Sequence, residues 1–148
     1  MRWATQLAVR VLDAILPAPE EAEHLRTGRR GEELAYFYLR KRKYVIVARN
    51  FRTPWHKSEL DMVGWNEGML CFIEVKTRTT RDVAPAEAAV DEEKRHDLRR
   101  VARHYLRQMP GRTPTRFDIV TVYLDKPKPE IAIIKSAFSM NGNLPPRH

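Results

Sequence analysis

The sequence contains one cysteine and lacks any long uninterrupted apolar run. Cys71 cannot form an intramolecular disulfide or a cysteine-rich zinc site, and its place among Met69-Leu70-Cys71-Phe72-Ile73 predicts a buried, unreactive thiol. No window approaches the roughly 18 apolar residues that a membrane-spanning helix needs. Arg10 and Asp13 interrupt the short apolar stretch near the N-terminus, so it does not resemble a signal peptide. These absences predict a reduced, cytoplasmic protein.

Acidic residues are also in the minority. The 148 residues include 27 Lys and Arg against 19 Asp and Glu, which gives a formal net charge of +8. This excess favours polyanionic partners, chiefly nucleic acid and secondly an anionic membrane surface, although a basic surface without a partner is the simpler alternative. The length fits one domain that buries a real core.

The N-terminal region is predicted to be an appendage to that domain. Trp3, Leu7, Val11 and Ile15 recur at helical spacing and predict an amphipathic helix that ends before Pro17. We interpret residues 1–26 as this helix and a linker, residues 27–138 as the main domain, and residues 139–148 as a flexible tail. The helix could be an accessory element, a packing arm or a surface anchor, and its pattern does not choose among them.

The remaining elements alternate in a way that is typical of an α/β fold. A helix is expected first, then three strands, a long helix and two further strands. This order predicts a mixed central sheet flanked by helices. The first helix is expected to run from about Thr27 or Arg29 to Arg42, and the second from about Glu87 or Asp91 to Gln108. The strands are expected at residues 44–48, 59–65, 69–76, 117–124 and 130–134.

Two carboxylates are predicted to face each other across the central hairpin. If Glu67 and Gly68 form a two-residue turn, Asp61 lies opposite Glu74, whereas a three-residue turn shifts the pairing by one. Opposed like charges destabilise a sheet unless a positive charge lies between them, and a divalent cation with oxygen ligands meets that need. Lys76 shares the strand face of Glu74, which taken alone is the spacing of an ordinary ion pair.

A third carboxylate is expected on the preceding helix. Glu32 shares a helix face with Gly28, Gly31 and Ala35, and the glycines would permit close approach to the sheet. The neighbouring Glu33 is turned about 100° away from this face.

An acid on a helix, an Asp on one strand and Glu-x-Lys on the next together resemble the PD-(D/E)xK nuclease superfamily. The pattern is more closely similar to the YraN-like family of small bacterial proteins, which resemble archaeal Holliday-junction resolvases in fold. The resemblance spans Gly28 to Ile134, and Ser58 departs from the glycine that the family usually has. It is carried by Gly28-Arg29-Arg30-Gly31-Glu32, Ala35, Arg49-Asn50-Phe51-Arg52, Glu59-Leu60-Asp61, Phe72-Ile73-Glu74-Val75-Lys76-Thr77-Arg78, Lys94 and Arg116-Phe117-Asp118.

The resemblance implies a restriction-endonuclease-like fold and a role for each residue of the motif. Asp61 and Glu74 would bind Mg²⁺ or Mn²⁺, and Glu32 would be a further ligand, direct or through water. Lys76 would orient or help to deprotonate the attacking water and stabilise transition-state charge. The implied activity is metal-dependent hydrolysis of phosphodiester bonds in nucleic acid, on DNA that is branched or single-stranded. Junction cleavage would favour a homodimer with two sites.

Basic residues on either side of these motifs are predicted to contact phosphates with little base specificity. Lys94 could reach the scissile phosphate or extend its amine to solvent, and Trp55 could stack on a base or anchor its loop. Glu59 alternates with Asp61 on one strand face and could support the site or simply pair with Lys76, whereas Asp118 is expected to form a structural hydrogen bond or ion pair rather than bind metal. Arg99 is expected on the side of the second helix opposite its apolar face. A non-catalytic nucleic-acid-binding protein and an adaptor that uses the N-terminal helix at a protein or membrane surface are the alternative functions. The predicted phosphate-binding residues are Arg29, Arg30, Arg49, Arg52, Lys57, Arg78 and Lys94.

Overall fold

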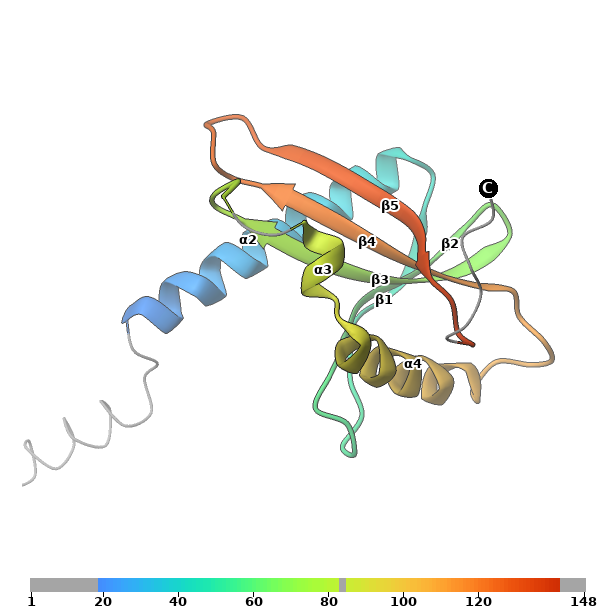
Figure 1. Ribbon diagram of the computed structural model, residues 1–148. Coiled ribbons are helices and arrows are strands. Elements are labelled where there is room, and N and C mark those ends of the chain that lie inside the picture. The colour runs from blue at the N-terminus through green and yellow to red at the C-terminus, as the bar shows by residue number, and fades with distance from the viewer. Residues whose placement is uncertain (1–18, 83–84, 142–148) are drawn as a thin grey trace, which may run out of the picture.

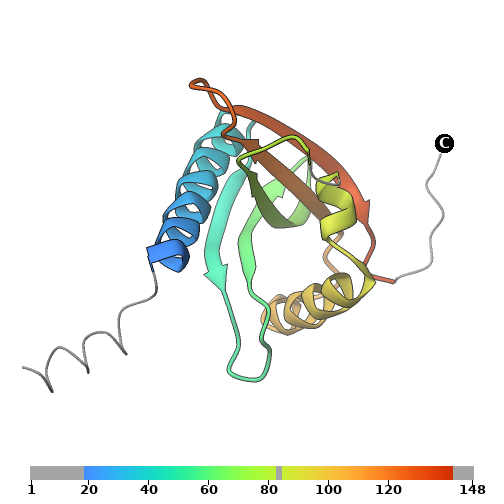
Figure 2. The same ribbon diagram turned by 60° about the vertical axis from the view of Figure 1, so that its left-hand side comes forward.

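The computed structural model describes residues 19–82 and 85–141, which form a mixed five-stranded sheet with helices on both faces (Figures 1 and 2). This arrangement confirms the predicted α/β architecture. The helix predicted over Trp3 to Ile15 and most of the predicted tail lie outside the described residues. Within those residues, no helix is both long and apolar enough to cross a membrane. The elements are α2 (Pro19–Lys41), β1 (Val45–Phe51), β2 (Leu60–Asn66), β3 (Met69–Arg78), α3 (Ala86–Ala89), α4 (Glu92–Leu106), β4 (Thr115–Tyr123) and β5 (Glu130–Phe138).

Helix α2 begins eight residues before Thr27, the earlier of its two predicted starts. The prediction of a linker up to residue 26 was therefore wrong for the described part of that segment, which is helical from Pro19. Proline is tolerated in the first turn of a helix, and Glu20 and Glu21 complement the positive end of the helix dipole there. In the sequence alone, the prolines and the acidic residues after them indicated a linker. In the structure, Pro19, Glu20 and Glu21 instead form the first turn of α2.

The β2–β3 hairpin has the two-residue turn that places the acidic residues opposite each other. Met62 pairs with Ile73 and Asn66 pairs with Met69. Glu67 and Gly68 have φ angles of 53° and 75°, and two positive φ angles in succession are the mark of a type I′ turn, whose twist matches that of the strands. The observed register confirms the two-residue alternative.

Strands β3 and β4 are parallel, and the chain crosses from one to the other through α3 and α4. Of the two starts predicted for the long helix, Glu87 and Asp91, the structure confirms the second. Asp91 has extended backbone angles and its side chain accepts a hydrogen bond from the Lys94 N–H at 2.9 Å, which separates α4 from the short α3. An N-cap of this kind starts a new helix. The crossover places α3 and α4 on one face of the sheet, while α2 covers the other (Figure 2).

Alternation along β3 divides the core into two layers. Leu70 and Phe72 pack with α3 and α4, whereas Cys71, Ile73 and Val75 pack with α2. Cys71 is fully buried, which confirms its predicted place. Because strand side chains alternate, Glu74 and Lys76 emerge on the α4 side of the sheet.

A buried ion pair lies away from this acidic region, at the start of β4. Arg116 donates two hydrogen bonds to the carboxylate of Asp118, at 2.8 and 3.0 Å, and the Tyr44 hydroxyl donates a third at 2.9 Å. Asp118 is only 1% exposed. The prediction of a structural ion pair for Asp118, rather than a metal ligand, is confirmed.

Candidate functional site

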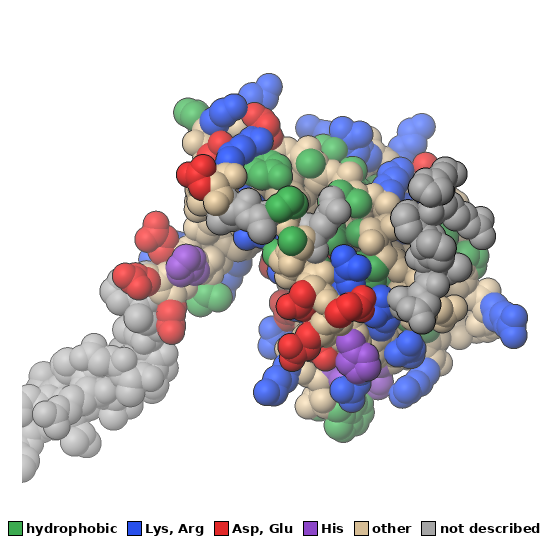
Figure 3. All heavy atoms as spheres, viewed as in Figure 1, with side chains coloured by type: hydrophobic (Ala, Val, Ile, Leu, Met, Phe, Trp, Pro, Cys, Tyr) green, Lys and Arg blue, Asp and Glu red, His purple; other side chains and the backbone are tan. Residues whose placement is uncertain are grey.

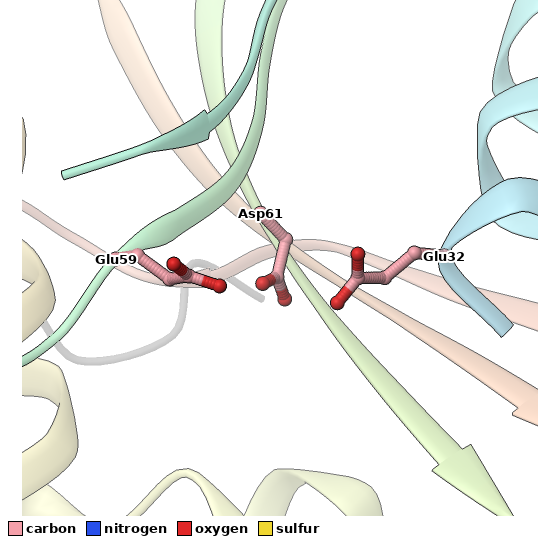
Figure 4. Close-up of side chains that lie close together, drawn as sticks. All are labelled: Glu32, Glu59 and Asp61. Atoms are coloured by element: carbon pink, nitrogen blue, oxygen red, sulfur yellow. The ribbon is translucent and has the colours of Figure 1, made fainter. Parts of the chain in front are cut away.

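Three carboxylates converge at the open end of the β2–β3 hairpin (Figure 4). Glu32 extends from α2, Asp61 from β2, and Glu59 from the loop that precedes β2. One carboxylate oxygen from each lies within 4.8 Å of the other two. Two oxygens on opposite sides of a Mg²⁺ ion are about 4.1 Å apart, so small side-chain rotations would bring this set into the range of one cation.

Asp61 occupies the centre of the cluster. Its side chain is almost buried, and its Oδ2 accepts a hydrogen bond from the Val75 N–H at 2.7 Å. Burial, together with the negative charge of Glu74, raises the pKa of Asp61 to about 8, and the Val75 hydrogen bond opposes that rise. The surroundings of Asp61 therefore disfavour its ionised form, and a positive charge close to the carboxylate would stabilise that form.

Glu74 is the most enclosed acid of the site and is only partly satisfied. Its Oε1 lies 3.3 Å from the Lys76 Nζ and 3.9 Å from the Lys94 Nζ. Its Oε2 is buried and has no hydrogen-bond partner in the described part of the chain. A buried carboxylate oxygen without a hydrogen-bond partner is costly. Its position beside other carboxylates fits the coordination of a cation.

The close approach of α2 to β3 brings Glu32 into the cluster. A Cβ added at Gly31 would overlap the Thr77 hydroxyl and lie 2.9 Å from the Thr77 Cβ, so only glycine fits there. Gly28 meets nothing within 4 Å, so the predicted close approach does not extend to it. Glu32 is half-buried whereas Glu33 is exposed. Burial and the charge of Glu59 raise the pKa of Glu32 above its usual range, although Arg49 opposes them.

The structure thus brings together the four residues predicted for the site, Glu32, Asp61, Glu74 and Lys76, and adds two more. The Lys94 Nζ lies 3.9 Å from Glu74 Oε1, and its side chain is 32% exposed, so Lys94 lies beside the site and also reaches solvent. Glu59 joins the acidic cluster and pairs with Arg52 rather than with Lys76. Alternation with Asp61 along one strand was the only sequence signal for Glu59, and it had indicated a supporting role at most.

The other predicted phosphate-binding residues lie around this cluster with different degrees of freedom. Arg29, Arg30, Arg49 and Lys57 are exposed. Arg52 is exposed but held by Glu59, and Arg78 is half-buried beside Glu32 in a hollow of about 390 Å³. The Nε of Arg78 has no partner among the described residues. Of these six side chains, the four exposed ones, Arg29, Arg30, Arg49 and Lys57, can therefore contact a ligand without first breaking an ion pair with the site.

Charge balance also fits a cation. When all are ionised, the four carboxylates Glu32, Glu59, Asp61 and Glu74 outweigh the ammonium groups of Lys76 and Lys94 by two charges. The ion pair of Glu59 with Arg52 compensates little, because the Arg52 side chain is 73% exposed and water screens it. Hard carboxylate oxygens without sulfur or histidine suit Mg²⁺, Mn²⁺ or Ca²⁺.

The fold and this cluster define a mixed α/β protein with an acidic pocket beside two lysines. Residues 31–122 match the family model described as "Uncharacterised protein family UPF0102". The chain is 79% identical to a UPF0102 protein of Koribacter versatilis over 96% of its own length and 99% of the relative. It is 47% identical to one of Solibacter usitatus, over 75% and 84% of the two chains. The chain belongs to the UPF0102 family, which confirms the predicted similarity to the YraN-like proteins.

Proposed function

We propose that this protein is a nuclease of the restriction-endonuclease-like PD-(D/E)xK group that hydrolyses phosphodiester bonds in DNA with bound Mg²⁺ or Mn²⁺. The observation that carries the proposal is the unpartnered, buried Oε2 of Glu74 beside Asp61, whose pKa is raised first by burial and then by the negative charge of Glu74. A purely structural acidic pair would be expected to bind its lysines with both oxygens or to be replaced by apolar residues at lower cost.

Asp61 and Glu74 would hold the ion from the two paired strands, with Glu32 and Glu59 approaching from either side. When bound, a divalent ion polarises a phosphate oxygen and lowers the pKa of a coordinated water. The Val75 N–H fixes the Asp61 carboxylate, and the Gly31–Thr77 contact fixes the distance of Glu32 from the sheet. The ligands are thus positioned by rigid elements rather than by a loop, apart from Glu59.

The two lysines supply the chemistry that belongs to the chain itself. Lys76 and Lys94 are 25% and 32% exposed, so each ammonium can meet a phosphate in the pocket while it remains close to Glu74. One ammonium would orient the attacking water, and the other would donate hydrogen bonds to the non-bridging oxygens as negative charge accumulates on them. The attacking water would add to phosphorus and release one proton to solvent, the bond from phosphorus to the leaving oxygen would break, and that oxygen would take up a proton from solvent water.

The substrate proposal rests on the basic surface. Arg29 and Arg49 are exposed, and their positive charges oppose the rise in the pKa of Glu32, while Arg30 and Lys57 are exposed two residues from Glu32 and Glu59 in the chain. These side chains would bind phosphates of a strand that enters the site. Cleavage of a branched substrate on both sides would need two sites and hence a homodimer, which sedimentation of the protein with and without a four-way junction would detect.

The test is cleavage of labelled branched, single-stranded and duplex DNA in Mg²⁺ or Mn²⁺. Wild type is compared with Asp61→Asn and Lys76→Met, and Glu33→Gln serves as a matched control because this exposed acid adjoins Glu32 on the helix. We expect both site variants to lose at least about 100-fold in single-turnover rate, and the control to retain wild-type activity. Equal rates in all four proteins, or no cleavage by wild type on any substrate, would overturn the proposal.

A further inference from the structure

A second concave site lies at the far end of α4 from Lys94. It is a hollow of about 450 Å³ between the tip of the β1–β2 loop and the exposed side of α4. In Figure 3 the lower part of the molecule carries histidine, lysine and arginine side chains, with a group of acidic side chains beside them. Its lining consists of one indole, two imidazoles and three guanidinium groups, from Trp55, His56, Arg100, Arg103, His104 and Arg107.

The indole of Trp55 is presented as an open platform. Its side chain belongs to a residue that is 73% exposed, which is unusual for the largest apolar side chain. Pro54 and Trp55 form the centre of a turn in which the His56 N–H donates to the Thr53 carbonyl at 3.4 Å, and the Thr53 hydroxyl lies 2.6 Å from His56 Nδ1. Thr53 itself is buried. A proline-containing turn closed by a side-chain contact loses little entropy when a ligand binds to it.

The indole lies beside α4. The Trp55 and His104 ring centroids are 5.4 Å apart and their planes are inclined by 52°, so the imidazole approaches the indole at an angle. His104 is in turn near Phe51, at 6.3 Å between ring centroids. Most of Trp55 is open to solvent. An exposed aromatic surface is suited to stacking by a planar group.

Among the described residues, no acid forms an ion pair with the guanidinium groups beside this platform, although Arg103 donates a hydrogen bond to the Met140 carbonyl at 3.3 Å. Arg100, Arg103 and Arg107 recur at three- and four-residue spacing, so they share one face of the helix. All three are exposed. The ion pairs of α4 in the described chain are those of Lys94, Arg95 and Arg99, nearer its N-terminus. Like charges at this spacing repel each other, and a chain of phosphates would relieve that repulsion.

We propose that this hollow is a subsite for an unpaired nucleotide of the substrate strand, with its base stacked on Trp55 and its phosphates on Arg100 and Arg107. The inference rests on the proposed function for the identity of the polyanion. In a duplex the base faces are already stacked, so only an unpaired base can offer a face to the indole. The substrate would therefore carry a single-stranded segment, as a flap, a gap or a free strand does.

The geometry connects this subsite to the carboxylate cluster. Trp55 precedes Glu59 by four residues, so their backbones lie within about 14 Å of each other. Lys94, beside Glu74, and Arg107, which caps α4, are about 20 Å apart along the helix axis at 1.5 Å per residue, but about 140° apart around it. Arg107 therefore faces the hollow, whereas Lys94 faces the acidic cluster. At a rise of about 3.4 Å per nucleotide, a stacked strand of about six nucleotides would cover this axial distance. The subsite and the cluster would thus bind different nucleotides of one strand.

The test measures binding without cleavage, by fluorescence anisotropy of labelled oligonucleotides with the full-length protein in EDTA. Trp55→Ala should weaken binding to a single strand by about 5- to 150-fold, while Trp55→Phe retains most of it and blunt duplex binding changes less than about two-fold. Arg100→Gln with Arg107→Gln should reduce the salt slope by about 1.4. The matched control is Arg112→Gln with Lys128→Gln, two exposed basic residues in other loops, which should change the slope far less.

Single-strand binding by Trp55→Ala that equals wild type would overturn the subsite, and so would equal losses on single strand and duplex. Competition by poly-glutamate that matches an oligonucleotide at equal charge would show a general anion surface instead. Since no metal is present, the outcome is independent of hydrolysis. A wild type that never cleaves but shows the Trp55 effect would refute the nuclease proposal alone.

Discussion

Replacement of Asp61 by Asn should make the metal-free protein more stable at pH 8, although it destroys the site. Asp61 binds its proton more tightly in the folded chain, where its pKa rises from an ordinary 3.8 to about 8. Below about pH 4 Asp61 is protonated in both the folded and the unfolded chain, and its contribution to the free energy of unfolding is complete. As the pH rises toward 8 that contribution is lost, because the unfolded chain releases this proton and the folded chain keeps it. Asn keeps an oxygen for the Val75 N–H at this position and never ionises, so the variant escapes the loss.

The size of the effect follows from the same shift. Each pH unit in which only the folded state keeps the proton removes up to ~1.4 kcal/mol from the free energy of unfolding. Asp61 and Glu74 are neighbouring acids whose titrations are coupled, so we expect only part of this pH range to contribute. The resulting difference in the free energy of unfolding is about 1–3 kcal/mol in favour of Asp61→Asn at pH 8. At pH 4.5 the two proteins should agree much more closely.

Urea unfolding followed by circular dichroism, in EDTA and again in Mg²⁺, measures both halves of this prediction. Mg²⁺ at about 100 times its dissociation constant should stabilise the wild type by about 2.7 kcal/mol and leave Asp61→Asn unchanged. Glu33→Gln, an exposed neighbour of the site, should behave as wild type throughout. An Asp61→Asn protein that is less stable than wild type at both pH values would refute the account of a carboxylate strained by its surroundings.

Three further predictions follow from individual contacts. Gly31→Ala should lower stability by about 1–3 kcal/mol, measured by urea unfolding, because the new Cβ overlaps Thr77, and adding Thr77→Ala should restore part of the loss. Asp118→Asn should cost about 3–5 kcal/mol, because it leaves the guanidinium of Arg116 buried without its counter-charge; a loss below 1 kcal/mol in the same assay would contradict this. Lys94→Met should slow single-turnover cleavage by about 10- to 1,000-fold while Mn²⁺ affinity, followed by calorimetry, stays within about three-fold.

Local pattern was sufficient to predict the features that depend on strand alternation and turn chemistry. The sequence offered a two-residue turn at Glu67-Gly68 as one of two alternatives, and the observed turn has that form, with the register that brings Asp61 next to the Glu74 strand. Helix phase selected Glu32 over Glu33, since a half-buried and an exposed residue lie about 100° apart on α2.

Features that depend on tertiary approach were not predictable in the same way. Glu59 belongs to the cluster because the loop before β2 folds back toward α2, and no periodic signal encodes the path of that loop. Helix periodicity alone allowed the Lys94 side chain to extend either to solvent or toward the site. The path of the crossover, which brings the start of α4 near Glu74 on β3, is a tertiary feature that periodicity does not encode. Arg99 was expected on the exposed side of α4, but it is 7% exposed and donates to the Ser139 carbonyl at 2.8 Å. The C-terminal end of β5 covers it, which helix periodicity alone cannot show.

The central claim is that these carboxylates hold one divalent ion, and a Mn²⁺ titration followed by electron paramagnetic resonance tests it most directly. At pH 8 we predict saturable binding by the wild-type protein, loss of at least about ten-fold in affinity in Glu74→Gln, and no change in Glu33→Gln. Binding of equal strength in all three proteins, or none by wild type at millimolar Mn²⁺, would contradict the assignment of the buried Glu74 oxygen to a metal.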